Sequence, residues 1–172
     1  MPALDSVLRQ KRDATVRAHM EAENAYEFDR CMNEFAHPRY EIVPTGESWD
    51  GHDGVGKLLL ENKTAFPDFT FIPEHIHHAE EAVFVEGRFT GTHLGPWRGL
   101  PATGRRIDFP ICIAFLFEED RMMCERTYFD IGTLLRQLGV GRDPNSMGGR
   151  IATMLNHPLT VAGAYLRQIV RR

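Results

Sequence analysis

Residues 107–139 constrain the fold more than any other stretch of the chain. The first part of this stretch alternates strictly, with an apolar side chain at every second position: Ile107, Phe109, Ile111, Ile113, Phe115 and Phe117. Alternate residues of a β-strand share one face, so the pattern predicts a strand with one fully buried side. A short acidic turn and a second strand follow, and an apolar helical segment then ends at Gly139.

On the second strand the same alternation groups Met122, Cys124, Arg126, Tyr128 and Asp130. Asp130 ends this row among aromatic residues, where burial could raise the pKa of its carboxyl group toward a value useful for acid–base chemistry. Asp130 is therefore the leading catalytic residue. The alternative is structural, because Asp commonly caps the first turn of a helix and the apolar helix starts directly after it.

The composition indicates an ordinary globular protein. With 172 residues, of which 42% are hydrophobic and 26% charged, the chain fits one domain with its own core. The net charge of −4 gives no reason to expect a nucleic-acid partner. Cys31, Cys112 and Cys124 form no CxxC motif, and reduced thiols suit a cytoplasmic protein. No apolar leader and no run of 18 apolar residues is found, so we expect no membrane partner.

Helical and extended patterns follow one another in a clear order. Apolar residues recur at three- and four-residue steps in residues 5–35, and a change of phase near Asn24 predicts two helices there. Asp53 is placed to cap a third helix that runs to Ala65. Short or long strands are expected at residues 40–43, 69–77, 83–93, 107–117 and 122–130.

This order predicts an α+β fold, because the helices precede an antiparallel meander instead of alternating with its strands. We expect a curved, antiparallel or mixed sheet wrapped around the N-terminal helices into a cone with an internal pocket. Residues 1–141 are expected to form this domain. Residues 142–172 are expected to form a helical extension that packs on the domain or on a partner subunit.

Two residues near the predicted 94–106 loop are further candidates for a functional role. His93 falls on the apolar side of its strand, where a histidine is more often a satisfied core residue than a functional one. Trp97 places a large apolar ring on a Gly- and Pro-rich loop. The indole either folds over the mouth of a pocket or packs on a partner subunit.

Familiar catalytic and cofactor motifs are missing. The sequence holds no GxGxxG, Walker, GxSxG or HExxH motif. His75, His77 and His78 form the one histidine cluster, but no carboxylate lies at a matching ligand spacing. We therefore expect no metal site.

Three segments carry a resemblance to a known family. They read AFPDF at residues 65–69, GTHLGPWRGLPATGRRIDF at 91–109 and ERTYFDIGTLLRQLG at 125–139. Together they resemble the SnoaL-like polyketide cyclase group of the nuclear transport factor 2-like superfamily of cone-shaped α+β barrels. The resemblance covers roughly residues 15–139.

The resemblance implies cofactor-free proton transfer on a hydrophobic, carbonyl-bearing small molecule inside the cone, and a homodimer. It implies that Asp130 acts as general acid or base and that His93 lines the same pocket. His93 or Tyr128 could then donate a proton, and Arg126 could give electrostatic support. The expected water-excluding wall consists of Trp49, Phe66, Trp97 and Phe109.

Three functions stay open at this point. The first is a cyclase, isomerase or lyase that abstracts a proton. The second is a non-catalytic protein that binds a hydrophobic small molecule in the same cavity. The third is a dimerisation platform, which would have a filled cone.

Overall fold

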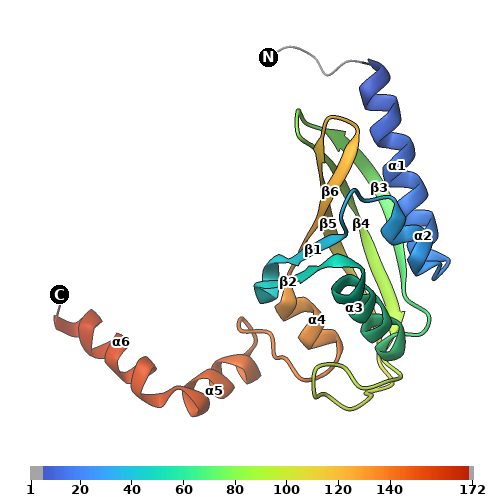
Figure 1. The fold of residues 1–172 in the computed structure, drawn as a ribbon. Helices are drawn as coiled ribbons and strands as arrows, with labels where there is room; N and C mark the ends of the chain where they lie inside the picture. The colour runs from blue at the N-terminus through green and yellow to red at the C-terminus, as the bar shows by residue number, and fades with distance from the viewer. Residues whose placement is uncertain (1–5, 171–172) are drawn as a thin grey trace.

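A six-stranded sheet forms the centre of the structure, a computed structural model that describes residues 6–170. The strand order is β2-β1-β6-β5-β4-β3, in which β1 and β6 run parallel and all other neighbours run antiparallel. The strands are β1 (Arg39–Ile42), β2 (Glu47–Asp50), β3 (Thr70–His78), β4 (Ala82–Thr92), β5 (Arg106–Glu118) and β6 (Arg121–Phe129). The predicted α+β fold with a curved sheet and N-terminal helices is confirmed, and the sheet is unclosed (Figure 1).

Helices from the N-terminal half cover the inner face of this sheet. α1 (Ser6–Asn24) lies along β3, β4 and β6, and α3 (Gly51–Ala65) packs against β1 and β2. The short α2 (Phe28–Asn33) joins α1 to α3 (Figure 1). The 3-10 turn η1 (Val43–Thr45) links β1 to β2, and α4 (Ile131–Gln137) packs on β5.

The alternating row of β5 forms the centre of the core, as predicted. All six of its apolar side chains are buried, with Phe115 fully inaccessible and Ile111 the most exposed at 8%. On β6 the residues opposite this row are Glu125, Thr127 and Phe129. They face the helices together with the β5 row because paired residues point to the same side of a sheet.

An irregularity in β6 decides which of its side chains reach the interior. Phe117 pairs with Met122, but the next β5 residue, Leu116, pairs with Cys124, so Met123 is an extra residue in its strand. Such a bulge shifts the register by one, and a one-residue shift moves every later side chain to the other face. The row predicted to face the pocket, from Cys124 to Tyr128, therefore faces outward.

Gly87 in β4 allows close approach of two strands. A Cβ atom at this position would overlap the carbonyl oxygen of Ile72 and lie 2.8 Å from the Phe71 ring. We expect Gly87→Ala to lower the free energy of unfolding by about 1–3 kcal/mol.

In contrast, Gly56→Ala in α3 would meet only the flexible end of Met32 at 3.8 Å. It should stabilise the protein by up to about 1 kcal/mol, because alanine favours the helix. Urea unfolding of both variants tests this pair, and equal effects would contradict it.

The C-terminal extension contains α5 (Met147–Asn156) and α6 (Pro158–Val170). In Figure 1 both helices extend away from the domain, and most of their described side chains are exposed. Packing of the extension on the domain or on a partner subunit stays a prediction. Within residues 6–170, no helix is long and apolar enough to cross a membrane.

Candidate functional site

A cavity lies between the inner face of the sheet and the helices. The space open to the centres of water molecules is about 110 Å³, several times the roughly 10–15 Å³ that one water needs by this measure. The wall is mainly aromatic and aliphatic, and its rings belong to Phe66, Phe71, Phe89, Trp97, Phe109, Phe115 and Phe129. The cone is therefore hollow, which argues against a filled dimerisation platform.

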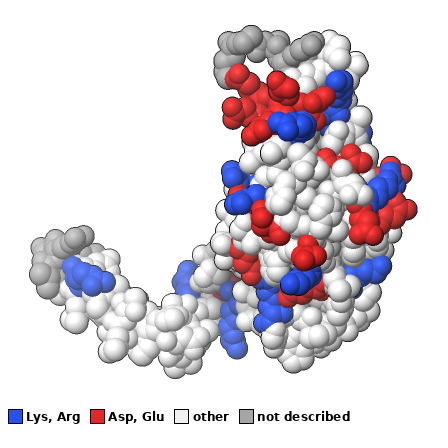
Figure 2. All heavy atoms as spheres, viewed as in Figure 1, with Lys and Arg blue, Asp and Glu red and all other residues white. Residues whose placement is uncertain are grey.

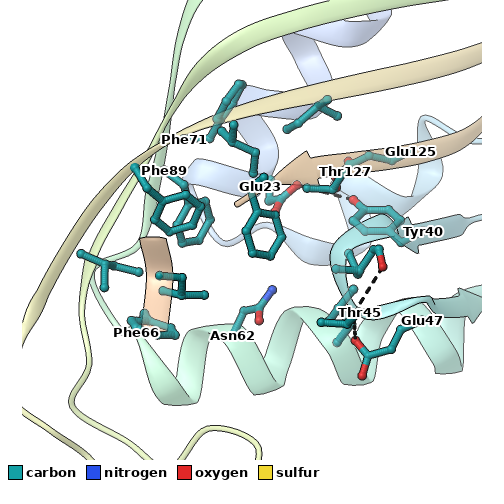
Figure 3. A pocket seen from close by; sticks show the side chains of 18 of the residues that line it. Glu23, Tyr40, Thr45, Glu47, Asn62, Phe66, Phe71, Phe89, Glu125 and Thr127 are labelled. Carbon is teal, nitrogen blue, oxygen red and sulfur yellow. Dashed lines mark hydrogen bonds between the residues drawn. The ribbon is translucent and has the colours of Figure 1, made fainter. Parts of the chain in front are cut away.

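One region of this wall is polar. It is built from three elements: His19 and Glu23 of α1, Tyr40 of β1, and Glu125 with Thr127 of β6. The parallel pairing of β1 with β6 places Tyr40 directly beside Glu125. Figure 3 shows Glu23, Tyr40, Glu125 and Thr127 gathered at one end of the cavity, away from the rings of Phe66 and Phe89.

Hydrogen bonds fix the orientation of the His19 ring. Its Nδ1 lies 3.1 Å from the carbonyl oxygen of Cys31, which can only accept, so Nδ1 carries a proton. The other nitrogen, Nε2, lies 3.0 Å from Glu125 Oε2 and 3.2 Å from the Tyr40 hydroxyl. The second oxygen of Glu125 accepts from the Thr127 hydroxyl at 3.2 Å. His19 Nε2 and Glu125 therefore form a hydrogen-bonded pair at the cavity wall.

The environment shifts the proton affinity of these groups. Burial alone would lower the pKa of His19, but hydrogen bonds with Cys31, Glu125 and Glu23 outweigh it and raise this pKa well above its usual value. Burial, together with the nearby charge of Glu23, raises the pKa of Glu125. Burial also raises the pKa of Tyr40 well above 10, so its hydroxyl stays a proton donor. The His19 imidazole, with its raised pKa, thus faces a carboxyl group whose pKa burial raises above its ordinary value.

Burial of such a charged set is unfavourable for stability. His19 is 1% exposed and Glu125 is 4% exposed. Removing two charged groups from water costs several kcal/mol per ion, which their attraction offsets only in part. Buried titratable groups with shifted pKa values that face a cavity are typical of functional sites.

The same cluster contains a possible set of metal ligands. His19, Glu23 and Cys31 offer ligand atoms that lie within 4.8 Å of one another. However, Cys31 Sγ lies 3.4 Å from His19 Nδ1 and 3.9 Å from Nε2. The thiol is therefore beside the ring on the Nδ1 side, and Nδ1 already donates to a carbonyl. The other ring nitrogen, Nε2, lies 3.0 Å from Glu125, so both nitrogens already have partners and this cluster fits a proton network better than a metal.

The less buried end of the cavity contains another group of polar side chains. Asn62 projects from α3 toward the cavity (Figure 3), and its side-chain amide has no hydrogen-bond partner among the described residues. Arg98 also lines this end and is paired with Glu47 and Glu61. Asn62 and Arg98 are partly exposed, whereas His19, Tyr40 and Glu125 are buried, so these side chains mark the entrance side.

Asp130 does not reach the cavity, contrary to the prediction. Its carboxylate is 63% exposed and accepts from the backbone N–H groups of Gly132 and Thr133 at 2.9 and 3.0 Å. It also accepts from the Thr133 hydroxyl and from Arg136. The Thr133 hydroxyl, with these other donors, lowers the pKa of Asp130. Asp130 is the N-cap of α4, which was the structural alternative.

Arg126 and Tyr128 also lie outside the cavity, because the bulge at Met123 turns their side of the strand outward. Arg126 points away from the helices and pairs with Glu41 at 2.6 Å. Tyr128 is 40% exposed on the same outer face. Both the predicted donor and the predicted electrostatic support therefore lie on the opposite side of the sheet from the cavity.

Three of the four residues predicted for the wall lie at the cavity. These are Phe66, Trp97 and Phe109, so the Trp97 indole folds back over the hollow. Trp49 packs at the edge of the core without lining the cavity. His93 does not line the cavity, contrary to the expectation from the resemblance. Its ring packs on Phe66, with ring centroids 5.1 Å apart, and its Nδ1 accepts from the Thr103 N–H. Burial lowers the pKa of His93.

The structural role of Asp130 can be tested directly. We expect Asp130→Ala to lower Tm by about 2–4 °C, because it removes a helix cap. Asp130→Asn keeps a side-chain oxygen that caps the helix, so it should change Tm by much less. Thermal unfolding monitored by circular dichroism measures both, and a large loss in the Asn variant would argue that the charge itself has a further role.

Several solved structures have a fold similar to that of this chain. A proposed SnoaL-like polyketide cyclase from Jannaschia sp. CCS1 is 17% identical with a TM-score of 0.69, and covers 77% of this chain and 94% of its own. TsrD from Streptomyces laurentii is 23% identical with a TM-score of 0.64, and the match covers 80% of this chain and 98% of TsrD. IdmH, a proposed polyketide cyclase from Streptomyces antibioticus, is 23% identical with a TM-score of 0.63, and the match covers 75% of this chain and 99% of IdmH.

At these identities the solved structures establish the fold alone. No curated protein matches the chain. The sequence pattern of the SnoaL-like polyketide cyclases, in contrast, matches residues 14–138, which is most of the chain. The protein belongs to the SnoaL-like polyketide cyclase family.

Proposed function

We propose that the protein is an enzyme that transfers a proton within a hydrophobic, carbonyl-bearing small molecule, in an aldol cyclisation or an isomerisation. The observation that carries the proposal is the buried Glu125–His19 pair on the wall of an otherwise apolar cavity. Family membership supports a cyclase-type function. The chemistry needs a base, a hydrogen-bond donor and a dry pocket, and no metal or organic cofactor.

Glu125 is the base in this mechanism. Its carboxylate takes a proton from the carbon next to the substrate carbonyl, and the C–H electrons move to the carbonyl oxygen to form an enolate. Tyr40 donates a hydrogen bond to that oxygen. In a cyclisation the enolate carbon attacks a second carbonyl and Glu125 returns its proton to the new alkoxide, whereas in an isomerisation the proton returns to carbon.

His19 positions and tunes the base. Its Nδ1–H is held by the Cys31 carbonyl, so Nε2 stays aimed at Glu125. The imidazolium keeps the carboxylate ionised and ready to accept a proton, while burial keeps the pKa of Glu125 above its ordinary value. A base is most effective when its pKa lies near the working pH.

A binding protein without catalysis is the second possibility, and one observation favours it. Both oxygens of Glu125 are already hydrogen-bonded within the protein. A carboxylate satisfied in this way could serve only to fix the core, and the aromatic wall would then hold a hydrophobic ligand.

Proton exchange separates these two functions without knowledge of the natural substrate. 2-Tetralone is a flat, apolar ketone whose α-protons exchange slowly with neutral D2O. We expect the protein to accelerate the loss of its α-proton signal in NMR, with saturation as the ketone fills the cavity. Saturable binding with exchange at the buffer rate would instead support the binding protein.

A further inference from the structure

The C-terminal extension, residues 142–172, has a surface that the domain does not use. The family pattern ends at residue 138, so α5 and α6 are additions to the domain. Both helices project from it (Figure 1). A short connection at residues 138–146, with Gly139, Gly141 and Pro144, joins them to α4.

Both helices carry a row of large, exposed apolar side chains on one side. The spacing is three, four or seven residues, which places them on a single helical face. These side chains are strongly exposed, from 48% for Met154 to 87% for Leu159. We call them the apolar stripe: Met147, Ile151, Met154 and Leu155 on α5, and Leu159, Leu166 and Ile169 on α6.

The charge of the extension differs in sign from that of the domain. After Asp143 the sequence has four arginines, Arg150, Arg167, Arg171 and Arg172, and no Asp or Glu. Positions 1–143 contain the other 16 of the 20 Lys and Arg residues and all 24 Asp and Glu residues. Figure 2 shows acidic groups over the domain, and the visible charged side chains of the projecting helices are basic.

The apolar stripe and the positive charge of the extension together indicate which partner could cover the stripe. Among the described residues of the domain, the large exposed apolar side chains come singly from α1, η1, α3, β3, β6 and two loops, so none of these elements carries a row that matches the stripe. A second extension would match in shape but would bring further arginines with no carboxylate to pair with them. An anionic lipid surface offers both an apolar layer and negative charge.

We propose that α5 and α6 bind the surface of membranes that contain anionic lipids, with the apolar stripe in the acyl boundary and the arginines at the headgroups. The expectation of no membrane partner came from the lack of a long apolar run. That criterion addresses helices that cross a bilayer, whereas helices that lie in its surface need only an apolar face.

Vesicle flotation of the full chain tests this proposal. We expect the protein to float with phosphatidylcholine vesicles that contain 30% phosphatidylglycerol, and to stay behind with phosphatidylcholine alone. Leu155→Gln/Leu166→Gln keeps the charge and removes two stripe residues, so binding should fall at least tenfold. Asn156→Ser/Gln168→Ser changes two residues on the other side of the same helices and should bind as the unmodified chain does. Arg150→Gln/Arg167→Gln should lose roughly fivefold per arginine.

Other results would overturn it. One is no flotation with anionic vesicles. Another is binding that all three variants retain, or binding equally strong to phosphatidylcholine alone. Sedimentation velocity supplies the remaining decisive result: a dimer that becomes monomeric in Leu155→Gln/Leu166→Gln would assign the stripe to a second copy of the chain. Because the substituted side chains are exposed, the domain should keep its circular dichroism spectrum and Tm in each variant.

Discussion

Glu125→Gln should reduce the rate of α-proton exchange in 2-tetralone by at least about a hundredfold, because a positioned general base contributes 10²–10⁴-fold. The amide keeps the size of the side chain and can still hydrogen-bond His19, but it cannot accept a proton. NMR in D2O measures the exchange rate, and ligand binding is measured in parallel. Binding should change little, since the cavity wall is mainly apolar.

Asp130→Asn is the matched control for this prediction, because it makes the same chemical change in the residue that the sequence favoured. Asp130 is an exposed helix cap, so its variant should exchange protons at the unmodified rate. If Asp130→Asn lost the activity and Glu125→Gln kept it, the base would be Asp130, and the role proposed for Glu125 would be wrong.

His19→Leu should lower the free energy of unfolding by about 3–5 kcal/mol, the usual cost of removing one partner of a buried ion pair. The loss leaves the buried Glu125 without its partner at 3.0 Å and removes one of the two donors to the Cys31 carbonyl. Leucine has a volume similar to that of histidine, so little of the cost comes from a cavity. Urea unfolding measures the effect.

The double variant His19→Leu/Glu125→Met separates the pair from its surroundings. Apolar replacement of both partners removes the uncompensated charge, so the double variant should be more stable than His19→Leu alone while having no exchange activity. This outcome would show that the loss in His19→Leu comes from the buried Glu125 charge that is left without a partner. A double variant whose loss equals the sum of the two single losses would show instead that the two residues do not interact.

The fold could be predicted because its signals are local. The alternation of Ile107 to Phe117 indicated a buried strand face, and the phase change near Asn24 matches the end of α1. The three segments that resemble the family pointed to the group that the family pattern identifies. Phe66, Trp97 and Phe109 line the cavity as predicted, because large apolar rings beside a curved sheet are buried on its inner face.

The polar site could not be predicted because its parts meet only in three dimensions. His19 and Glu125 are 106 residues apart, and no motif links them. The bulge at Met123 then moved Glu125 inward and turned Arg126 and Tyr128 outward. A bulge often carries a glycine, but methionine gives no such sign. The predicted homodimer and the cytoplasmic location stay predictions.

The position that an enol takes inside the protein is the most direct test of the proposed active site. A crystal structure with 2-naphthol, a flat analogue of the 2-tetralone enol, measures it. We expect the naphthol rings between the aromatic walls, and the hydroxyl group within hydrogen-bonding distance of Tyr40 or Glu125. A hydroxyl group bound instead at Asp130, with the cavity free of naphthol, would contradict the assignment of the active site.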